Sequence, residues 1–306
     1  MAVVKVANWP EAKAIGHGLV RWAFRGHASS EWGLSSSLER AANAVDSPLQ
    51  FLGNREYWMR TQFMRRAHHY LSDLPEDGRH IEWLALMQHH GCPTRLLDFT
   101  YSFYVAAFFA LESAAGPSAV WAVNLERLES FANRKLGVTQ QGRDTMFDVY
   151  QRYTSAAEEA VSAQEGPTYL LPVEPFRVNE RLSIQQGLFL MGCDVGRPFV
   201  DNLAGSLDLE PGMVKQTLDV PAGEVNLISA RDFALIKIVL PHEVQYDALR
   251  DLRSMNITAA TLFPGLDGFS RSLSYHLHGE LTNKRMRAVG MDPEARPDRG
   301  GLASDN

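Results

Sequence analysis

The chain has 306 residues, of which 45% are hydrophobic and 22% are charged. This composition is typical of a soluble globular protein with one large domain or two modest ones. The formal net charge is −6 at pH 7, which excludes a basic field over the whole molecule but leaves room for a local basic patch.

Cysteine usage, the N-terminus and the longest apolar run bear on the compartment. Cys92 and Cys193 are the two cysteines of the chain, and so low a count suits a reducing cytosol rather than a disulfide framework. The N-terminus lacks the basic, apolar and small-residue order of a secretion signal. The apolar run at residues 104–111 is too short to span a bilayer. We therefore expect a cytoplasmic protein with no membrane partner.

Hydrophobic periodicity predicts helices early in the chain and strands mainly later. The first part is predicted to contain, in order, a strand at residues 22–26, helices at 55–71 and 81–90, a fully buried helix at 104–111 and a strand at 118–125. Residues 126–169 are mostly polar and are predicted to be a helical or irregular insertion. The last part is predicted to contain strands at 187–192 and 233–240, a helix from residue 241 to Asn256, a short strand at 258–264 and a helix at 265–277. The mixture indicates an α+β fold.

The sequence FRGH at residues 24–27 is the first candidate site. Arg25 ends a predicted strand and carries a planar fork of hydrogen-bond donors that suits a phosphate, a carboxylate or a ribose edge. Gly26 would let the backbone approach a ligand closely. The alternative is an arginine that bridges loop carbonyl groups.

The most polar stretch, QHHGCPTRLLDFT at residues 88–100, stands directly before the predicted buried helix. Its candidate ligand-binding residues are Gln88, His89, Thr94, Arg95, Asp98 and Thr100. Because a buried helix is a rigid support, we expect Gln88, His89, Arg95 and Asp98 to line one pocket. The alternative is an Arg95–Asp98 ion pair that only holds a loop. Metal binding or a Cys92 nucleophile is disfavoured, since no second pair has zinc-site spacing and neighbouring residues rarely point at one atom.

Two later clusters add candidates. Arg181, Gln185 and Gln186 precede a predicted strand and could bind ligand amides or sugar hydroxyls, or else loop backbone. Asp267 opens the last predicted helix, where an aspartate is most often an N-cap.

These motifs resemble the FRG domain, a largely bacterial family. The resemblance is carried by FRGH, by EWGLSSSLER at residues 31–40, by the 88–100 block with AAFFAL after it, and by AVWAVN and NERLSIQQGLF further on. It runs from about residue 22 to about residue 273, with Phe99 where the family usually has Trp. It implies a single FRG domain over residues 1–287 and a disordered tail at 288–306, which is rich in Pro, Gly, Asp and Arg.

A second resemblance is to the arginine class of ADP-ribosyltransferases. It implies an ADP-ribosyltransferase-like β core with surrounding helices, NAD as the substrate and no metal. Arg25 would then hold the NAD phosphate or ribose, and residues 94–100 would take the place of the Ser-Thr-Ser strand. The segment QQGLF would match the strand of the catalytic Glu, but this chain has Gln185 and Gln186 there. Glu180 or Asp267 would take that role, or the chemistry differs, or the site only binds.

The two resemblances together imply an NAD-dependent ADP-ribosyltransferase or NAD glycohydrolase that acts as a toxin or phage-defence effector. Its partners would be a nucleotide, a protein or nucleic-acid acceptor, and an antitoxin or another defence component. The missing Glu favours an alternative, a non-catalytic module that senses a nucleotide or RNA. The chain lacks P-loop, Rossmann, α/β-hydrolase and zinc-protease motifs, which disfavours those classes.

Overall fold

A computed structural model of the protein describes residues 1–138, 144–163, 165–177, 179–207, 218–221 and 233–274. The chain forms a first compact unit, Met1–Ile257, and a second unit that begins at Thr258. The predicted tail at residues 288–306 and the last residues of the predicted final helix lie outside the described residues. The extent of the expected FRG domain, residues 1–287, stays a prediction.

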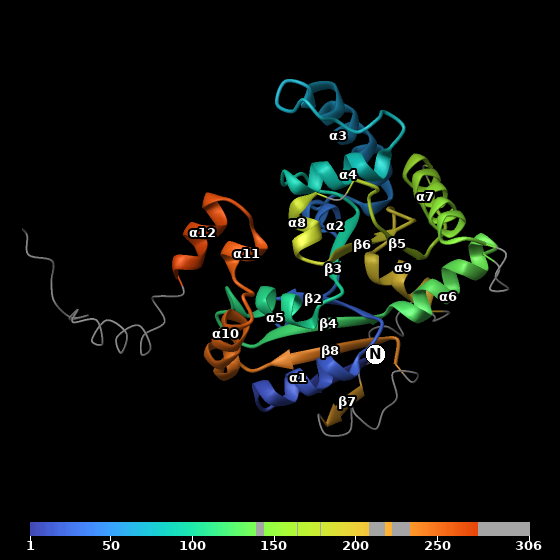
Figure 1. Ribbon diagram of the computed structural model, residues 1–306. Helices are drawn as coiled ribbons and strands as arrows, with labels where there is room; N and C mark the ends of the chain where they lie inside the picture. Colours follow the sequence, from blue (N-terminus) through green and yellow to red (C-terminus); the bar gives the residue numbers. More distant parts are fainter. Residues whose placement is uncertain (139–143, 164, 178, 208–217, 222–232, 275–306) are drawn as a thin grey trace, which may run out of the picture. The chain divides into compact units, whose positions relative to one another are not determined.

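The first unit is built on one mixed sheet with the strand order β5-β6-β3-β2-β4-β8-β1-β7 (Figure 1). The strands are β1 (Ala2–Lys5), β2 (Trp22–His27), β3 (Leu96–Thr100), β4 (Ser118–Asn124), β5 (Leu170–Val173), β6 (Gly187–Gly192), β7 (Leu218–Pro221) and β8 (Leu235–Leu240). β1 pairs in parallel with β7 and with β8, and the other neighbours are antiparallel.

Helices surround this sheet. Those of the first unit are α1 (Trp9–Gly18), α2 (Ser37–Asn43), α3 (Leu52–Ala67), α4 (His80–His89), α5 (Phe103–Leu111), α6 (Leu125–Leu136), α7 (Met146–Ser162), α8 (Glu180–Ile184), α9 (Phe199–Ser206) and α10 (Gln245–Ser254), with short 3-10 helices η1 (Leu49–Phe51) and η4 (His242–Val244). The second unit contains α11 (Ala259–Leu262) and α12 (Leu266–Ser272). The predicted mixed fold with surrounding helices is confirmed.

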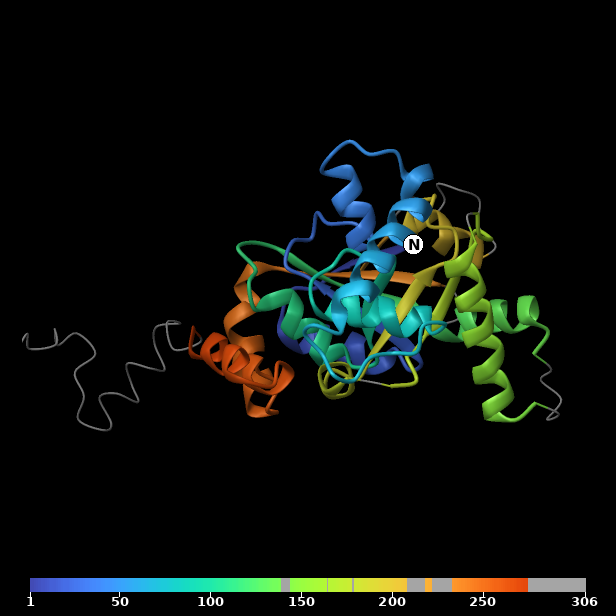
Figure 2. The same ribbon diagram turned by 90° about the horizontal axis from the view of Figure 1, so that it is seen from above.

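The helices α6 and α7 occupy the stretch predicted as an insertion, residues 126–169. Both pack against β5, and Figure 2 shows them at one side of the first unit. The predicted buried helix is also present as α5, in which Tyr104 and Phe109 alone are partly exposed. Its N-cap is Ser102, whose Oγ accepts a hydrogen bond from the backbone N of Val105 at 3.3 Å. α5 packs on β2 and β4, so the polar end of the 88–100 stretch, with Asp98 and Thr100 on β3, is followed at once by a rigid element.

The sheet opens between β2 and β3. These strands pair at one position only, Phe24 opposite Thr100. Continued antiparallel pairing would place Gly26 opposite Asp98, but the ladder stops before that point. Beyond it, β2 stays paired with β4 and β3 stays paired with β6. The sheet therefore divides into two halves, β5-β6-β3 and β2-β4-β8-β1-β7. A gap separates them, and the single pair Phe24–Thr100 joins them at one end of it.

Two differences from the expected elements stand out. The strand expected at residues 258–264 is wrong, since the residues form helix α11 instead. Thr258 explains it: its Oγ1 accepts from the backbone N of Thr261, whose own Oγ1 accepts from the backbone N of Thr258. This capping box closes a helical turn in a sequence whose residue types favour strands. The periodicity also gave no sign of β1, α1 or β5, which are short or lie near the N-terminus.

No described helix is both long and apolar enough to cross a bilayer. Both cysteines are free: Cys193 is buried and Cys92 is partly exposed.

Candidate functional site

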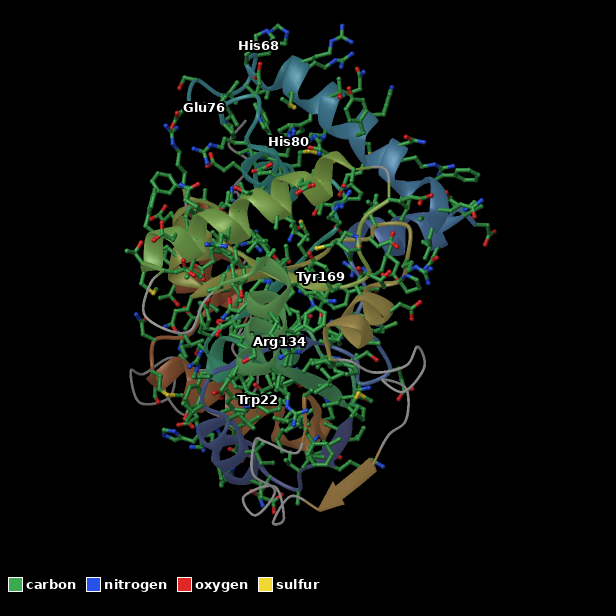
Figure 3. The ribbon with its side chains drawn as sticks, turned by 90° about the vertical axis from the view of Figure 1, so that its right-hand side faces the viewer. Trp22, His68, Glu76, His80, Arg134 and Tyr169 are labelled. Carbon is green, nitrogen blue, oxygen red and sulfur yellow. The ribbon has the colours of Figure 1, made fainter. Side chains whose placement is uncertain are left out.

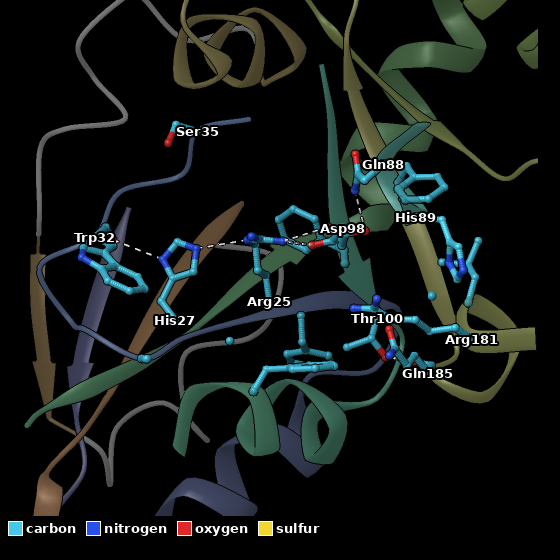
Figure 4. Close-up of a pocket in the computed structure, with 18 of the residues that line it drawn as sticks. Arg25, His27, Trp32, Ser35, Gln88, His89, Asp98, Thr100, Arg181 and Gln185 are labelled. Atoms are coloured by element: carbon cyan, nitrogen blue, oxygen red, sulfur yellow. Dashed lines mark hydrogen bonds and ion pairs between the residues drawn. The ribbon is translucent and has the colours of Figure 1, made fainter. Parts of the chain in front are cut away.

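A cavity of about 800 Å³ lies in the gap between the two halves of the sheet (Figure 4). Cavities of this size suit small-molecule ligands. Its apolar lining includes four phenylalanines, Phe24, Phe99, Phe109 and Phe189. The polar lining comes from β2 and the segment after it, from the end of α4, from β3 and from α8.

The guanidinium group of Arg25 is fixed by contacts on both sides. Its Nε donates a hydrogen bond to His27 Nε2 at 3.0 Å, and its Nη1 donates to the backbone O of Asp98 at 2.7 Å. Nη1 also lies 3.6 Å from Asp98 Oδ2. The side chain of Arg25 therefore spans the gap where the backbone ladder between β2 and β3 has stopped, as Figure 4 shows.

His27 is a neutral acceptor in this arrangement. Because its Nε2 accepts from Arg25, its proton is on Nδ1, which lies 3.4 Å from the backbone O of Trp32 and donates to it. Burial and, to a lesser degree, the positive charge of Arg25 lower the pKa of His27 to about 4, against the opposing effect of the bond to Trp32. A protonated imidazole would lose the Arg25 contact and face its charge.

The wall around Arg25 is cationic. Arg40 and Lys237 also hold the pKa of His27 down by their charge. Burial lowers the pKa of Arg25 itself, with Asp98 acting in the opposite direction and Arg40 in the same direction. So many positive groups around a partly buried arginine create a site that an anion would stabilise.

Asp98 presents a carboxylate to the cavity. Its Oδ1 accepts a hydrogen bond from Gln88 Nε2 at 2.7 Å, and the side chain keeps 58% of its exposure. Gln88 is held in turn by Thr94, whose Oγ1 donates to Gln88 Oε1. Thr94 is fully buried and does not line the cavity, so its contribution is to orient Gln88.

The opposite wall is formed by the end of α4 and by α8. Burial lowers the pKa of His89, and the charges of His90 and Arg181 lower it further. Thr100 Oγ1 donates to the backbone O of Gln185 at 2.7 Å, which ties β3 to the end of α8. Gln186 has a φ of 48°, an uncommon conformation for a residue other than glycine.

The structure brings most of the expected site residues together. The cavity lining includes Arg25, Gly26, Gln88, His89, Asp98, Thr100, Arg181 and Gln185. The lining does not include Gln186 or Glu180, whose side chains are exposed. Asp267 lies in the first turn of α12 in the second unit, where Gly265 and not Asp267 is the N-cap residue.

Arg95 does not join the cavity and does not pair with Asp98. Its guanidinium binds Glu56 through Nε to Oε2 at 2.6 Å and through Nη2 to Oε2 at 2.5 Å. Both side chains are nearly inaccessible, at 3% and 1% exposure. The expected pocket of Gln88, His89, Arg95 and Asp98 therefore forms without Arg95, which holds α3 to the start of β3.

Gly26 is required by a helix rather than by a ligand. A Cβ at this position would lie 2.0 Å from the backbone O of Ala106 and 2.5 Å from the backbone N of Ala110. No real Cβ makes such contacts, so the absent side chain is what lets α5 pack on β2.

Sequence reasoning missed three residues of the site: His27, Trp32 and Arg40. The signal for His27 was available, because residues two apart on a strand point to the same face, and Arg25 was already a candidate. Trp32 and Arg40 lie in the EWGLSSSLER segment, in which no hydrophobic period or ligand motif marks them as cavity residues.

Cys92 is not an activated thiol. Burial raises its pKa, and the charge of Glu56 raises it further, whereas a nucleophilic cysteine needs a lowered pKa. Among the described residues, no three His, Cys, Asp or Glu side chains are grouped as metal ligands would be.

Comparison with known proteins bears on residues 20–118, which match the model of the FRG domain family. Neither the curated proteins nor the solved structures gave a match to the chain. The matched region holds Arg25, His27, Gln88 and Asp98, whereas Arg181 and Gln185 at α8 lie beyond it. Residues 20–118 are thus similar to the FRG domain family, and this region includes β2 and the cavity residues of α4 and β3.

Proposed function

We propose that the cavity binds a nucleotide that carries a diphosphate group, with NAD as the first candidate. The observation that supports this most is the fixed fork of Arg25. His27 occupies its Nε and the Asp98 carbonyl occupies Nη1. Within the described residues, Nη2 has no hydrogen-bond acceptor, so its two protons stay available to a phosphate oxygen.

The rest of the lining fits such a ligand. Arg40 adds a second guanidinium beside Arg25, and Arg181 adds a third on the opposite wall. Trp32 keeps 57% of its exposure at the cavity and offers a flat surface on which a base could stack. Gln88 and Gln185 offer amide groups for ribose hydroxyls.

Cleavage of the bound NAD is the second candidate function, and it is favoured by the carboxylate of Asp98. Its exposed carboxylate lies in the same cavity as Arg25, with one oxygen held by Gln88. A carboxylate there could stabilise the positive charge on the ribosyl group while nicotinamide departs with the electrons of its C–N bond. Water or an acceptor side chain would then attack the ribosyl carbon. Such an enzyme would deplete NAD or modify host molecules, as a toxin or phage-defence effector does.

A calorimetric titration of the protein with NAD, with nicotinamide release followed in parallel, tests both candidates. Arg25→Lys keeps the charge but loses the fork, so we expect NAD affinity to fall by about 10- to 100-fold, the effect of one or two charged hydrogen bonds. The matched control is Arg55→Ala, an exposed arginine on α3 outside the cavity. Unchanged affinity in Arg25→Lys would contradict the proposal.

Asp98→Asn separates binding from cleavage. Asparagine keeps the Oδ1 acceptor for Gln88 but has no negative charge. If Asp98 supports cleavage, nicotinamide release should be lost while NAD still binds. If wild type binds NAD and releases no nicotinamide, the non-catalytic sensing module is the correct reading, as Gln185 and Gln186 suggest.

A further inference from the structure

A second concave surface lies on α3, outside the cavity that contains Arg25. We call it the α3 groove, and it has a volume of about 860 Å³. It is formed by one side of α3, the turn that follows, and the loop after α4, and it shares no lining residue with the candidate NAD site.

The groove has an apolar floor and aromatic ends. Met59, Phe63 and Ala67 line it at intervals of one helical turn. A parallel stripe begins at Trp58 on α3 and continues to Tyr70 in the turn after the helix, with exposures of 61% and 83%. Exposed aromatic side chains of this size beside an apolar depression are typical of protein-binding sites.

The rim of the groove is basic. Arg66 lines it, and the side chains of Arg55 and Arg65 are exposed on the same helix. The single acidic residue of α3, Glu56, is buried and bound to Arg95. His68 lies just beyond the end of the helix, at the outer edge of the first unit in Figure 3.

Three acidic side chains follow in the next loop: Asp73 and Glu76 are in ion pairs, and Asp77 is exposed. Asp73 is 3.0 Å from Arg177, and Glu76 is 3.9 Å from Arg79. These two paired carboxylates therefore offset the positive charge of α3 less than unpaired ones would. A basic, aromatic helix face on a chain of net charge −6 is a local feature that calls for a negatively charged partner.

We propose that the α3 groove binds an amphipathic helix of a partner protein, with an apolar stripe on the floor and acidic residues along the flank that faces Arg66. On α3 the lining of the groove runs from Trp58 to Ala67, nine positions apart, which corresponds to about 14 Å along the helix. A partner helix of about three turns fills that length, with anchors at i, i+3 or i+4, and i+7. The apolar floor disfavours a nucleic-acid strand, because phosphates need several clustered cations and Arg66 is the one arginine in the lining.

Peptide display on the full-length protein tests this inference. The library presents 16-residue helices with fixed leucines at a, d and e positions and Glu, Lys or Gln at every other position. We expect the retained peptides to be enriched in Glu on one flank. Their affinity should fall about thirtyfold for Trp58→Ala, the size of an interface hot spot. The matched control is Tyr57→Ala, which removes a neighbouring aromatic side chain that is 62% exposed and does not line the groove.

A charge exchange makes the test specific. Arg66→Glu should weaken the Glu-flanked peptides, and a Lys-flanked version should regain binding to this variant. Retained peptides without acidic enrichment, equal loss in Tyr57→Ala, or no retained peptide at all would each overturn the proposal. So would tight binding of a fluorescent 20-nucleotide oligo(dT) that Trp58→Ala abolishes, because the groove would then be a nucleic-acid site. Self-association of the protein that Trp58→Ala abolishes would assign the groove to a second copy and would overturn it as well.

Discussion

Arg25 and His27 depend on each other at the level of single atoms. Arg25 can donate from Nε only while His27 Nε2 is unprotonated, and His27 keeps that state because burial and the nearby positive charges lower its pKa to about 4. The imidazole is thereby a hydrogen-bond acceptor at neutral pH and fixes the direction of the fork. His27 is in this sense a positioning residue for Arg25.

This coupling predicts a loss of stability in mild acid. In the unfolded chain His27 takes up a proton near its ordinary pKa of 6.5, whereas the folded protein does so near 4. Between these pH values the unfolded state binds more protons, so the free energy of unfolding falls as the pH falls. The His27 contribution approaches about 3 kcal/mol at the lower end. Urea titrations of wild type and His27→Gln from pH 7 to pH 4 measure it.

His27→Gln is a suitable comparison because its Oε1 can still accept from Arg25 but does not titrate. His80 and His89 also have lowered pKa values, so part of the acid sensitivity should remain in the variant. Equal pH dependence in the two proteins would show that His27 does not contribute.

The buried pair of Arg95 and Glu56 should have a structural effect only. Arg95→Leu leaves the Glu56 carboxylate buried without its partner, and we expect a loss of about 3–5 kcal/mol in the free energy of unfolding. Lys13→Ala is the contrasting variant, because Lys13 and Asp251 form a half-exposed pair worth at most about 1 kcal/mol. Denaturant unfolding compares the two. A small loss in Arg95→Leu, together with lost nucleotide binding, would contradict the structural assignment.

At the scale of elements, α5 and β2 are packed backbone to backbone. Phe103 of α5 also meets Phe24 of β2 edge to face, with ring centroids 5.8 Å apart. This packing sets the position of β2 from one side, while the gap toward β3 stays open on the other. The polar residues of the 88–100 block thus precede the buried helix α5. This helix packs on β2, and β2 holds Arg25 opposite Asp98.

Gly26→Ala tests this packing. The new Cβ would overlap the backbone of α5, so the helix would have to shift, and we expect a loss of about 1–3 kcal/mol or more. Gly33→Ala is the control, since Gly33 also lines the cavity but a Cβ there meets no atom within 4 Å. Thermal melts and NAD titrations of both variants separate the readings. An unchanged melting temperature with lost NAD binding would show that Gly26 serves ligand approach instead.

At the scale of the whole molecule, the cavity belongs to the first unit alone. Each residue of its lining lies within Met1–Ile257. We therefore expect a chain that ends at Ile257 to fold and to bind nucleotide as the full chain does, because its sheet and core are complete. Circular dichroism and an NAD titration of the shortened protein check this. If the full chain cleaves NAD and the shortened one binds but does not cleave it, Asp267 would return as a catalytic candidate.

The sequence predicted much of the fold where local patterns are strong. The apolar run of α5, the β-rich run of β4 and the stretch of β6 were placed almost at their observed bounds. The strand prediction for residues 258–264 was wrong because a capping box of two threonines outweighed their strand propensity. Part of the site could also be predicted from the sequence, since Arg25, Gln88 and Asp98 all line the cavity.

Residue type and spacing by themselves determined which polar side chains stand beside rigid elements, because periodicity and capping act over a few neighbouring residues. They could not decide which partner each side chain takes. Arg95 pairs with Glu56, which lies 39 positions earlier, and Gly26 packs against the backbone of α5. Only the tertiary structure decided that β2 and β3 separate after one pair and that Arg25 spans the gap. Such contacts depend on how strands distant in sequence are placed side by side, which no local pattern encodes.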